Sequence, residues 1–108
     1  MKKYLFILSG CLNQHPIDFN TTYEQALKLN SYMCDSLEEM RDILHQYQEN
    51  PLVSGGYWTG GPIYSNITKE VIATLSWNGR CWQGLGQTVD GEMTDEIFDL
   101  EEAFEYGL

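Results

Sequence analysis

The sequence EVIATLSWNGRCWQGL, residues 70–85, decides the fold class, because it has the pattern of two strands joined by a tight turn. Side chains alternate along its first half with the two-residue period of a half-buried strand. Asn78-Gly79 follows, and this pair is typical of a type I′ turn, in which both central residues take positive φ. The stretch therefore predicts a β-hairpin with strands over 70–77 and 80–85.

A two-residue turn also fixes the expected register of this hairpin. It would pair Trp77 with Arg80, and Leu75 with Trp82, across the ladder. Trp77, Leu75 and Trp82 would then share one face, where aromatic and aliphatic cross-strand contacts stabilise a sheet. We therefore expect Trp77 and Trp82 to belong mainly to the core.

Two further elements are expected before residue 34. Residues 3–9 are apolar and aromatic, which favours a strand that is buried on both faces. Thr21 and Thr22 are each followed three residues later by Glu or Gln, so either can form a capping box that begins a helix. The pattern predicts that this helix covers residues 23–33.

A second central helix is predicted after Ser36, which can form a capping box with Glu39. The Asn50-Pro51 pair ends it, because the residue before a proline disfavours helical backbone. One apolar stripe runs along this segment at spacings of three and four residues. Its members are Leu37, Met40, Ile43, Leu44 and Tyr47.

The last expected element is a helix over residues 95–106. At 100° per residue, Ile97, Leu100 and Phe104 cluster on one side of it. Acidic residues occupy the opposite arc, and Phe98 and Tyr106 fall within that arc. The acids of the arc are Asp95, Asp99, Glu101, Glu102 and Glu105.

These elements predict an α+β fold with a single domain over residues 1–108. The expected architecture is a small antiparallel sheet that includes the 70–77/80–85 hairpin and is covered on one face. Two central helices and an acidic C-terminal helix would pack on this sheet.

Charge is distributed very unevenly along the chain. The formal net charge is −10, from 16 acidic and 6 basic residues. Residues 90–108 hold eight of the acids and no Lys or Arg. Such a surface repels nucleic acid and anionic membranes and attracts cationic proteins, so direct binding to DNA or RNA is not expected.

Enzymatic and metal-dependent chemistry has little support in the sequence. Cys11, His15 and Asp18 lie close together but match no nucleophile motif. Cys11 and His15 form one ligand-like pair without the second pair that a zinc site needs. The carboxylates after residue 90 lack the spacing of a calcium loop. We therefore expect a protein that is not an enzyme and has no metal or cofactor.

The cysteines indicate a reducing compartment. Three cysteines without close spacing make a poor disulfide framework, so free thiols in a cytoplasmic protein are expected. Leu8-Ser9-Gly10-Cys11 fits the cleavage motif of a bacterial lipoprotein. The apolar stretch before it is about five residues, short of the ~7–15 of a signal core. A strand is the preferred interpretation of that stretch.

The acidic C-terminal segment is the candidate binding surface. Its predicted partner-binding residues are Asp95, Phe98, Asp99, Glu101, Glu102, Glu105 and Tyr106, together with Trp58 from a glycine-rich segment. Carboxylates on such a surface can stand in for phosphates, while the aromatic residues supply apolar anchors. The expected partner is a basic protein, such as a nuclease or a nucleic-acid-binding complex.

Three roles fit these features. In size and acidity the chain resembles phage-type antagonists of bacterial defence, such as anti-CRISPR or anti-restriction proteins. An immunity protein that neutralises a nuclease toxin has the same properties. A non-catalytic structural or assembly subunit, with the acids as a solvated face, is the third possibility.

Overall fold

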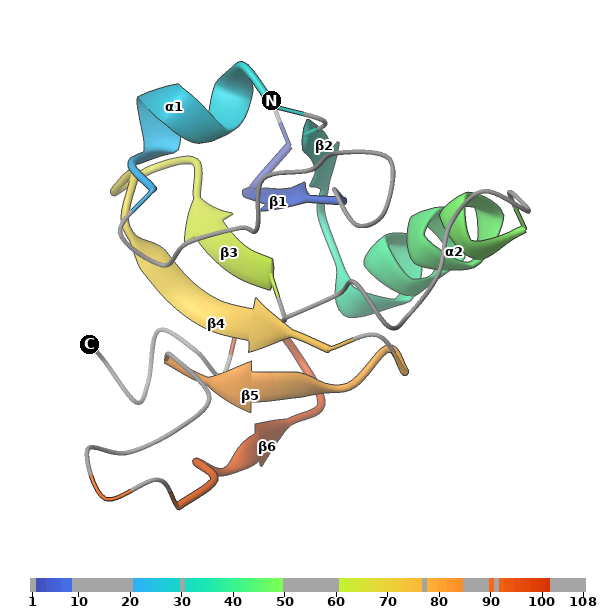
Figure 1. The fold of residues 1–108 in the computed structure, drawn as a ribbon, viewed down its shortest axis with the longest axis vertical. Coiled ribbons are helices and arrows are strands. Elements are labelled where there is room, and N and C mark those ends of the chain that lie inside the picture. The colour runs from blue at the N-terminus through green and yellow to red at the C-terminus, as the bar shows by residue number, and fades with distance from the viewer. Residues whose placement is uncertain are drawn as a thin grey trace.

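The computed structural model describes residues 2–8, 21–29, 31–49, 61–76, 78–84, 90 and 92–101. These residues form one six-stranded antiparallel sheet and two helices, which confirms the α+β class (Figure 1). The strand order is β2-β1-β3-β4-β5-β6. The strands are β1 (Tyr4–Ile7), β2 (Ser31–Cys34), β3 (Gly61–Ser65), β4 (Val71–Leu75), β5 (Cys81–Gln83) and β6 (Glu96–Ile97). The helices are α1 (Tyr23–Leu27) and α2 (Leu37–Gln48).

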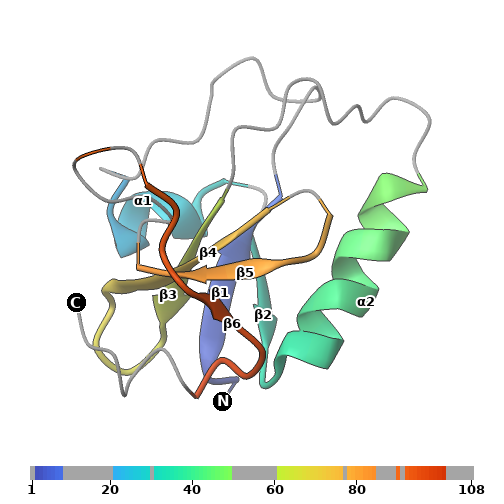
Figure 2. The ribbon, with the colours of Figure 1, turned by 90° about the horizontal axis from the view of Figure 1, so that it is seen from below.

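Strand β1 lies inside the sheet and is buried on both faces, as its apolar sequence predicts. Tyr4 and Phe6 belong to one core cluster, whereas Leu5 and Ile7 belong to a second cluster on the opposite face. The second cluster includes Ala26 of α1. Figure 2 shows α1 and α2 on opposite sides of the sheet. The expectation of a sheet covered on one face is therefore wrong, because the alternating apolar residues of β1 need cover on both sides.

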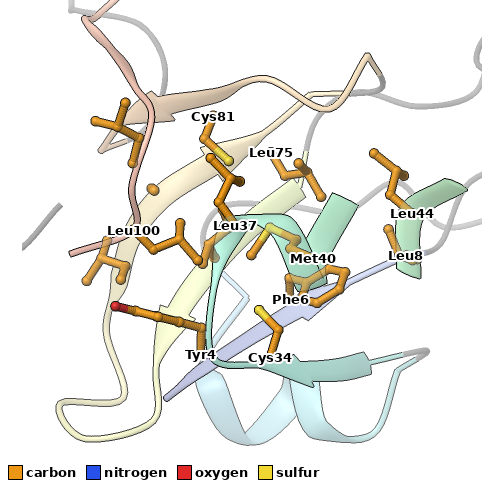
Figure 3. Packing of buried hydrophobic residues seen from close by; sticks show 14 residues of the cluster. Tyr4, Phe6, Leu8, Cys34, Leu37, Met40, Leu44, Leu75, Cys81 and Leu100 are labelled. Atoms are coloured by element: carbon orange, nitrogen blue, oxygen red, sulfur yellow. The ribbon is translucent and has the colours of Figure 1, made fainter. Parts of the chain in front are cut away.

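Helix α2 closes the larger core, and its predicted start is confirmed. The Ser36 side chain accepts a hydrogen bond from the Glu39 amide at 3.2 Å, which satisfies one of the free donors at the helix start. Leu37, Met40 and Leu44 are buried against the sheet (Figure 3). The apolar stripe of the sequence is thus the face that the helix buries.

Helix α1 is shorter than the sequence predicts. It begins at the Thr22 capping box, in which the side chains of Thr22 and Gln25 each accept from the other residue's backbone amide. It ends at Leu27 instead of continuing to residue 33. Residues 31–34 form β2 and pair with β1, where Cys34 is fully buried. Pairing with a buried strand outweighs the weak helix preference of this segment.

The hairpin forms between β4 and β5, but its register differs by one residue from the prediction. The Ser76 amide donates to the Arg80 carbonyl at 2.9 Å, so the loop has three residues instead of two. Gly79 has φ +85°, a left-handed conformation that glycine adopts without strain. Such three-residue loops end with a left-handed residue of this kind.

This register decides which side chains enter the core. Leu75 pairs with Cys81, and Thr74 pairs with Trp82. Leu75 and Cys81 are therefore buried in the larger core, whereas Trp82 is half-buried on the other face. The expected common face of Leu75 and Trp82 is wrong. Trp77 lies outside the described residues.

The predicted C-terminal helix is wrong over residues 95–101. Glu96–Ile97 is strand β6, which pairs with β5, and a turn follows it. Ile97 and Leu100 are fully buried, as expected, but they reach the core from a strand and a turn. A helix would have kept acids three and four residues apart with no basic residue between them, which disfavours it. Residues 102–108, with Phe104, lie outside the described residues.

Two buried thiols give a test of this core. Burial raises the pKa of Cys34 and of Cys81 from 9.0 to about 12. Unfolded thiols ionise above pH 9 while the folded ones stay protonated, so the free energy of unfolding should fall as pH rises from 9 towards 12. Urea unfolding at pH 8, 9.5 and 10.5 measures this fall.

The double variant Cys34→Ala, Cys81→Ala is the control for the thiol experiment. Its unfolding free energy should fall less steeply over the same range, because the two thiols that ionise only in the unfolded chain are gone. Only the slopes are compared, so a lower starting stability does not matter. Equal slopes in both proteins would contradict the assignment.

Candidate functional site

The candidate site is the segment 92–101, which contains β6 at one end of the sheet; we call it the acidic edge. Two hydrogen bonds attach it to β5 in addition to the pairing of β6 with β5. The Gln83 amide donates to the Asp95 carbonyl at 2.8 Å, and the Thr94 hydroxyl donates to the Gln83 carbonyl at 2.8 Å. Buried Ile97 and Leu100 anchor it to the core. The segment is therefore held in place by the sheet.

Exposed apolar side chains lie among the acids of this edge. The Phe98 side chain, between the two buried anchors, is 70% exposed, and Met93 is 54% exposed. A large aromatic residue at such exposure contributes little to folding. Aromatic residues are enriched among the dominant contacts of protein interfaces. Phe98 is thus the strongest single indication of a binding surface.

Acidic residues flank Phe98 in the sequence of this edge. Asp95 and Asp99 are exposed, and the Asp99 carboxylate also accepts from the Glu101 amide at 3.1 Å, which stabilises the turn after β6. Glu101 lies 3.5 Å from the Lys3 ammonium, with both side chains more than half exposed. Such a surface pair contributes at most about 1 kcal/mol and leaves both groups accessible to solvent.

A cluster next to this edge was not expected from the sequence. The Arg80 guanidinium lies 4.8 Å from the centre of the Trp82 ring and pairs with the Glu96 carboxylate. Arg80 and Trp82 are two residues apart on β5 and its turn, and Trp82 is paired with Glu96 across the ladder. Arg and Trp are common hot-spot residues. The pairing of β6 with β5 places Glu96 beside Arg80 and Trp82.

The predicted site residues divide into two groups. The structure brings Asp95, Phe98, Asp99 and Glu101 together at the acidic edge, all of them exposed. Glu102, Glu105, Tyr106 and Trp58 lie outside the described residues.

The described part of the chain gives no support for a metal site or for a reactive cysteine. No group of three or more His, Cys, Asp or Glu side chains there is placed to hold a metal ion. Cys34 and Cys81 are buried free thiols, and Cys11, His15 and Asp18 lie outside the described residues.

The glycosylation pattern at Asn66-Ile67-Thr68 has a structural role. The Asn66 side chain donates to the Lys2 carbonyl at 2.7 Å and accepts from the Tyr23 hydroxyl at 2.5 Å. Asn66 is 4% exposed, and its side-chain amide links the segment before β1, the turn after β3 and α1. A glycan on this nitrogen would require the turn to open.

An open hollow lies beside α1. It is lined by Thr22, Tyr23, Glu24, Leu27 and Lys69. The Lys69 ammonium donates to the Asn66 carbonyl at 2.6 Å and lies 4.4 Å from the centre of the Tyr23 ring. The cation of this hollow is therefore already engaged inside the protein, which makes the hollow a weaker candidate than the acidic edge.

No helix among the described residues is both long enough and apolar enough to cross a membrane. Comparison of the chain with protein-family models, curated proteins and solved structures finds no significant match.

Proposed function

We propose that the protein binds and neutralises a basic, nucleic-acid-targeting protein through the acidic edge. The observation that carries the proposal is Phe98, which is 70% exposed and lies in sequence between the exposed acids Asp95 and Asp99. The carboxylates would attract and orient a cationic partner, and the aromatic ring would supply the apolar contact that charge alone does not give.

The placement of the basic side chains supports this proposal. Lys2, Lys3 and Arg80 each pair with carboxylates of the chain itself. The Arg41 side chain donates to the Gly79 carbonyl at 2.7 Å, and Lys69 is engaged as described above. Five of the six basic residues are thus held by internal contacts. The excess of acids then dominates what an approaching protein meets, and it accelerates encounter with a basic surface.

The role that fits best is a phage-type inhibitor, of the anti-CRISPR or anti-restriction kind, that occupies a site normally filled by nucleic acid. The carboxylates would contact Arg and Lys side chains that otherwise bind phosphates. An immunity protein against a nuclease toxin would use the same surface. The two differ in the identity of the captured partner: a host defence complex in the first case, a toxin nuclease in the second.

Neutralising acids at the edge should weaken this inhibition about tenfold. The test variant carries Asp95→Asn, Asp99→Asn and Glu101→Gln; asparagine at 99 keeps an acceptor for the backbone amide of residue 101. Three exposed charges at ~0.5 kcal/mol each correspond to about a tenfold change in affinity. The measurement is inhibition of DNA cleavage by purified defence nucleases and toxin nuclease domains at 50 and 300 mM salt.

The matched control carries Glu24→Gln, Glu49→Gln and Glu70→Gln, three exposed acids away from the edge. Both triple variants change the net charge by the same amount. The proposal requires that the edge variant lose inhibition and the control retain it. Equal losses would mean that net charge alone acts, and no loss in either would exclude a role for the edge.

A further inference from the structure

The outer side of β6 presents unpaired backbone in the described part of the chain. Asp95 is hydrogen-bonded to Gln83, and Ile97 stands two residues further along the same ladder, opposite Cys81. Hydrogen-bonded and non-hydrogen-bonded pairs alternate in an antiparallel ladder, so the pair of Glu96 with Trp82 is a non-hydrogen-bonded one. The amide and carbonyl of Glu96 therefore point away from β5. No described strand lies beyond them.

The charges beside this backbone select what can pair with it. Two copies of the edge would bring Asp95 and Asp99 of each chain together, and like charges across a ladder are destabilising. A strand that carries basic side chains would instead be attracted by Asp95 and Asp99. The opposite sheet edge, β2, has no charged residue within Ser31–Cys34 and offers no such selectivity.

We propose that the partner supplies an extended basic segment that adds to the sheet as a seventh strand beside β6. Its backbone would hydrogen-bond to the amide and carbonyl of Glu96, as in other complexes formed by strand addition. Its Lys or Arg side chains would face Asp95 and Asp99, and an apolar residue would pack on Phe98. This inference rests on the proposed function and specifies the shape of the partner's contact.

The test uses a defined probe, an acetylated and amidated heptapeptide of alternating lysine and valine. A second peptide has the same sequence with N-methyl groups on two adjacent central residues. Adjacent residues of a strand point their amides to opposite sides, so this change blocks both edges of the peptide while its charge stays the same. The readouts are the dissociation constant and the hydrogen-exchange rate of the Glu96 amide, measured by NMR.

We expect the unmodified peptide to bind at least tenfold more tightly than the N-methylated one and to slow exchange at the Glu96 amide. The variant Glu96→Pro, which removes that amide without removing a bond to β5, should lose this advantage. Glu96→Gln, which keeps the amide and loses the charge, should retain it. If Glu96→Pro does not fold, the two peptides still decide the question on the unaltered protein.

Equal binding of the two peptides, or unchanged exchange at Glu96, would overturn strand addition. That result would leave the proposed function intact if the edge triple variant still loses inhibition and its matched control does not. Conversely, loss of inhibition in neither triple variant would reject the proposed function even if the peptide adds to β6. The two failures are therefore distinguishable.

Discussion

Replacing Phe6 with alanine is expected to lower the free energy of unfolding by about 3–5 kcal/mol. Phe6 is fully buried in β1, which lies between β2 and β3. Its ring is 5.9 Å from that of Tyr32 on β2, and it belongs to the core that α2 covers. Domains of this size have a total stability of about 5–15 kcal/mol, so the loss would bring the protein close to its unfolding threshold.

The matched control for Phe6→Ala is Ile67→Ala, which also truncates a large apolar side chain. Ile67 is 80% exposed, so its replacement should change stability by no more than about 0.5 kcal/mol. Urea unfolding followed by circular dichroism measures both variants. Similarly small effects of the two substitutions would show that Phe6 is not in a packed core. They would contradict the burial of β1 on both faces of the sheet.

Local signals in the sequence were sufficient for β1 and α2. β1 is apolar on both faces, and α2 has a capping serine with a continuous apolar stripe, so each pattern fits only one structure. For the segment 95–101, local signals did not decide between a helix and a strand. The three-residue spacing of Ile97 and Leu100 fits a helix face, but these residues also fit a strand followed by a turn. The pairing with β5 that decides between them is a long-range contact.

The hairpin shows the same limit on a smaller scale. Asn78-Gly79 indicates a turn, but it does not decide between a two-residue loop and a three-residue loop with Gly79 in the last position. A difference of one residue moves Trp82 to the other face. Charge and aromatic content pointed to Asp95, Phe98 and Asp99 as candidate binding residues. They did not reveal the contact of Glu96 with Arg80, which depends on the pairing of β6 with β5.

Phe98→Ala is expected to weaken binding to the basic partner by about 2 kcal/mol, or roughly 30-fold, while leaving stability almost unchanged. The first part follows from the cost of truncating an aromatic hot spot. The second follows from exposure: at 70% exposed, the ring buries too little surface for its removal to affect folding much. A core residue would show the opposite pattern, which is why both quantities must be measured on the same variant.

Ile67→Ala again serves as the control, because it removes an apolar side chain that is even more exposed than Phe98 from the turn between β3 and β4. Isothermal titration against the captured partner should show the loss for Phe98→Ala alone. The loss should persist at 300 mM salt, since an apolar contact is not screened, whereas the effect of the edge triple variant should shrink. A Phe98→Ala protein that binds as tightly as the unaltered one would contradict the role of Phe98 as the apolar anchor, which is the observation that carries the proposed function.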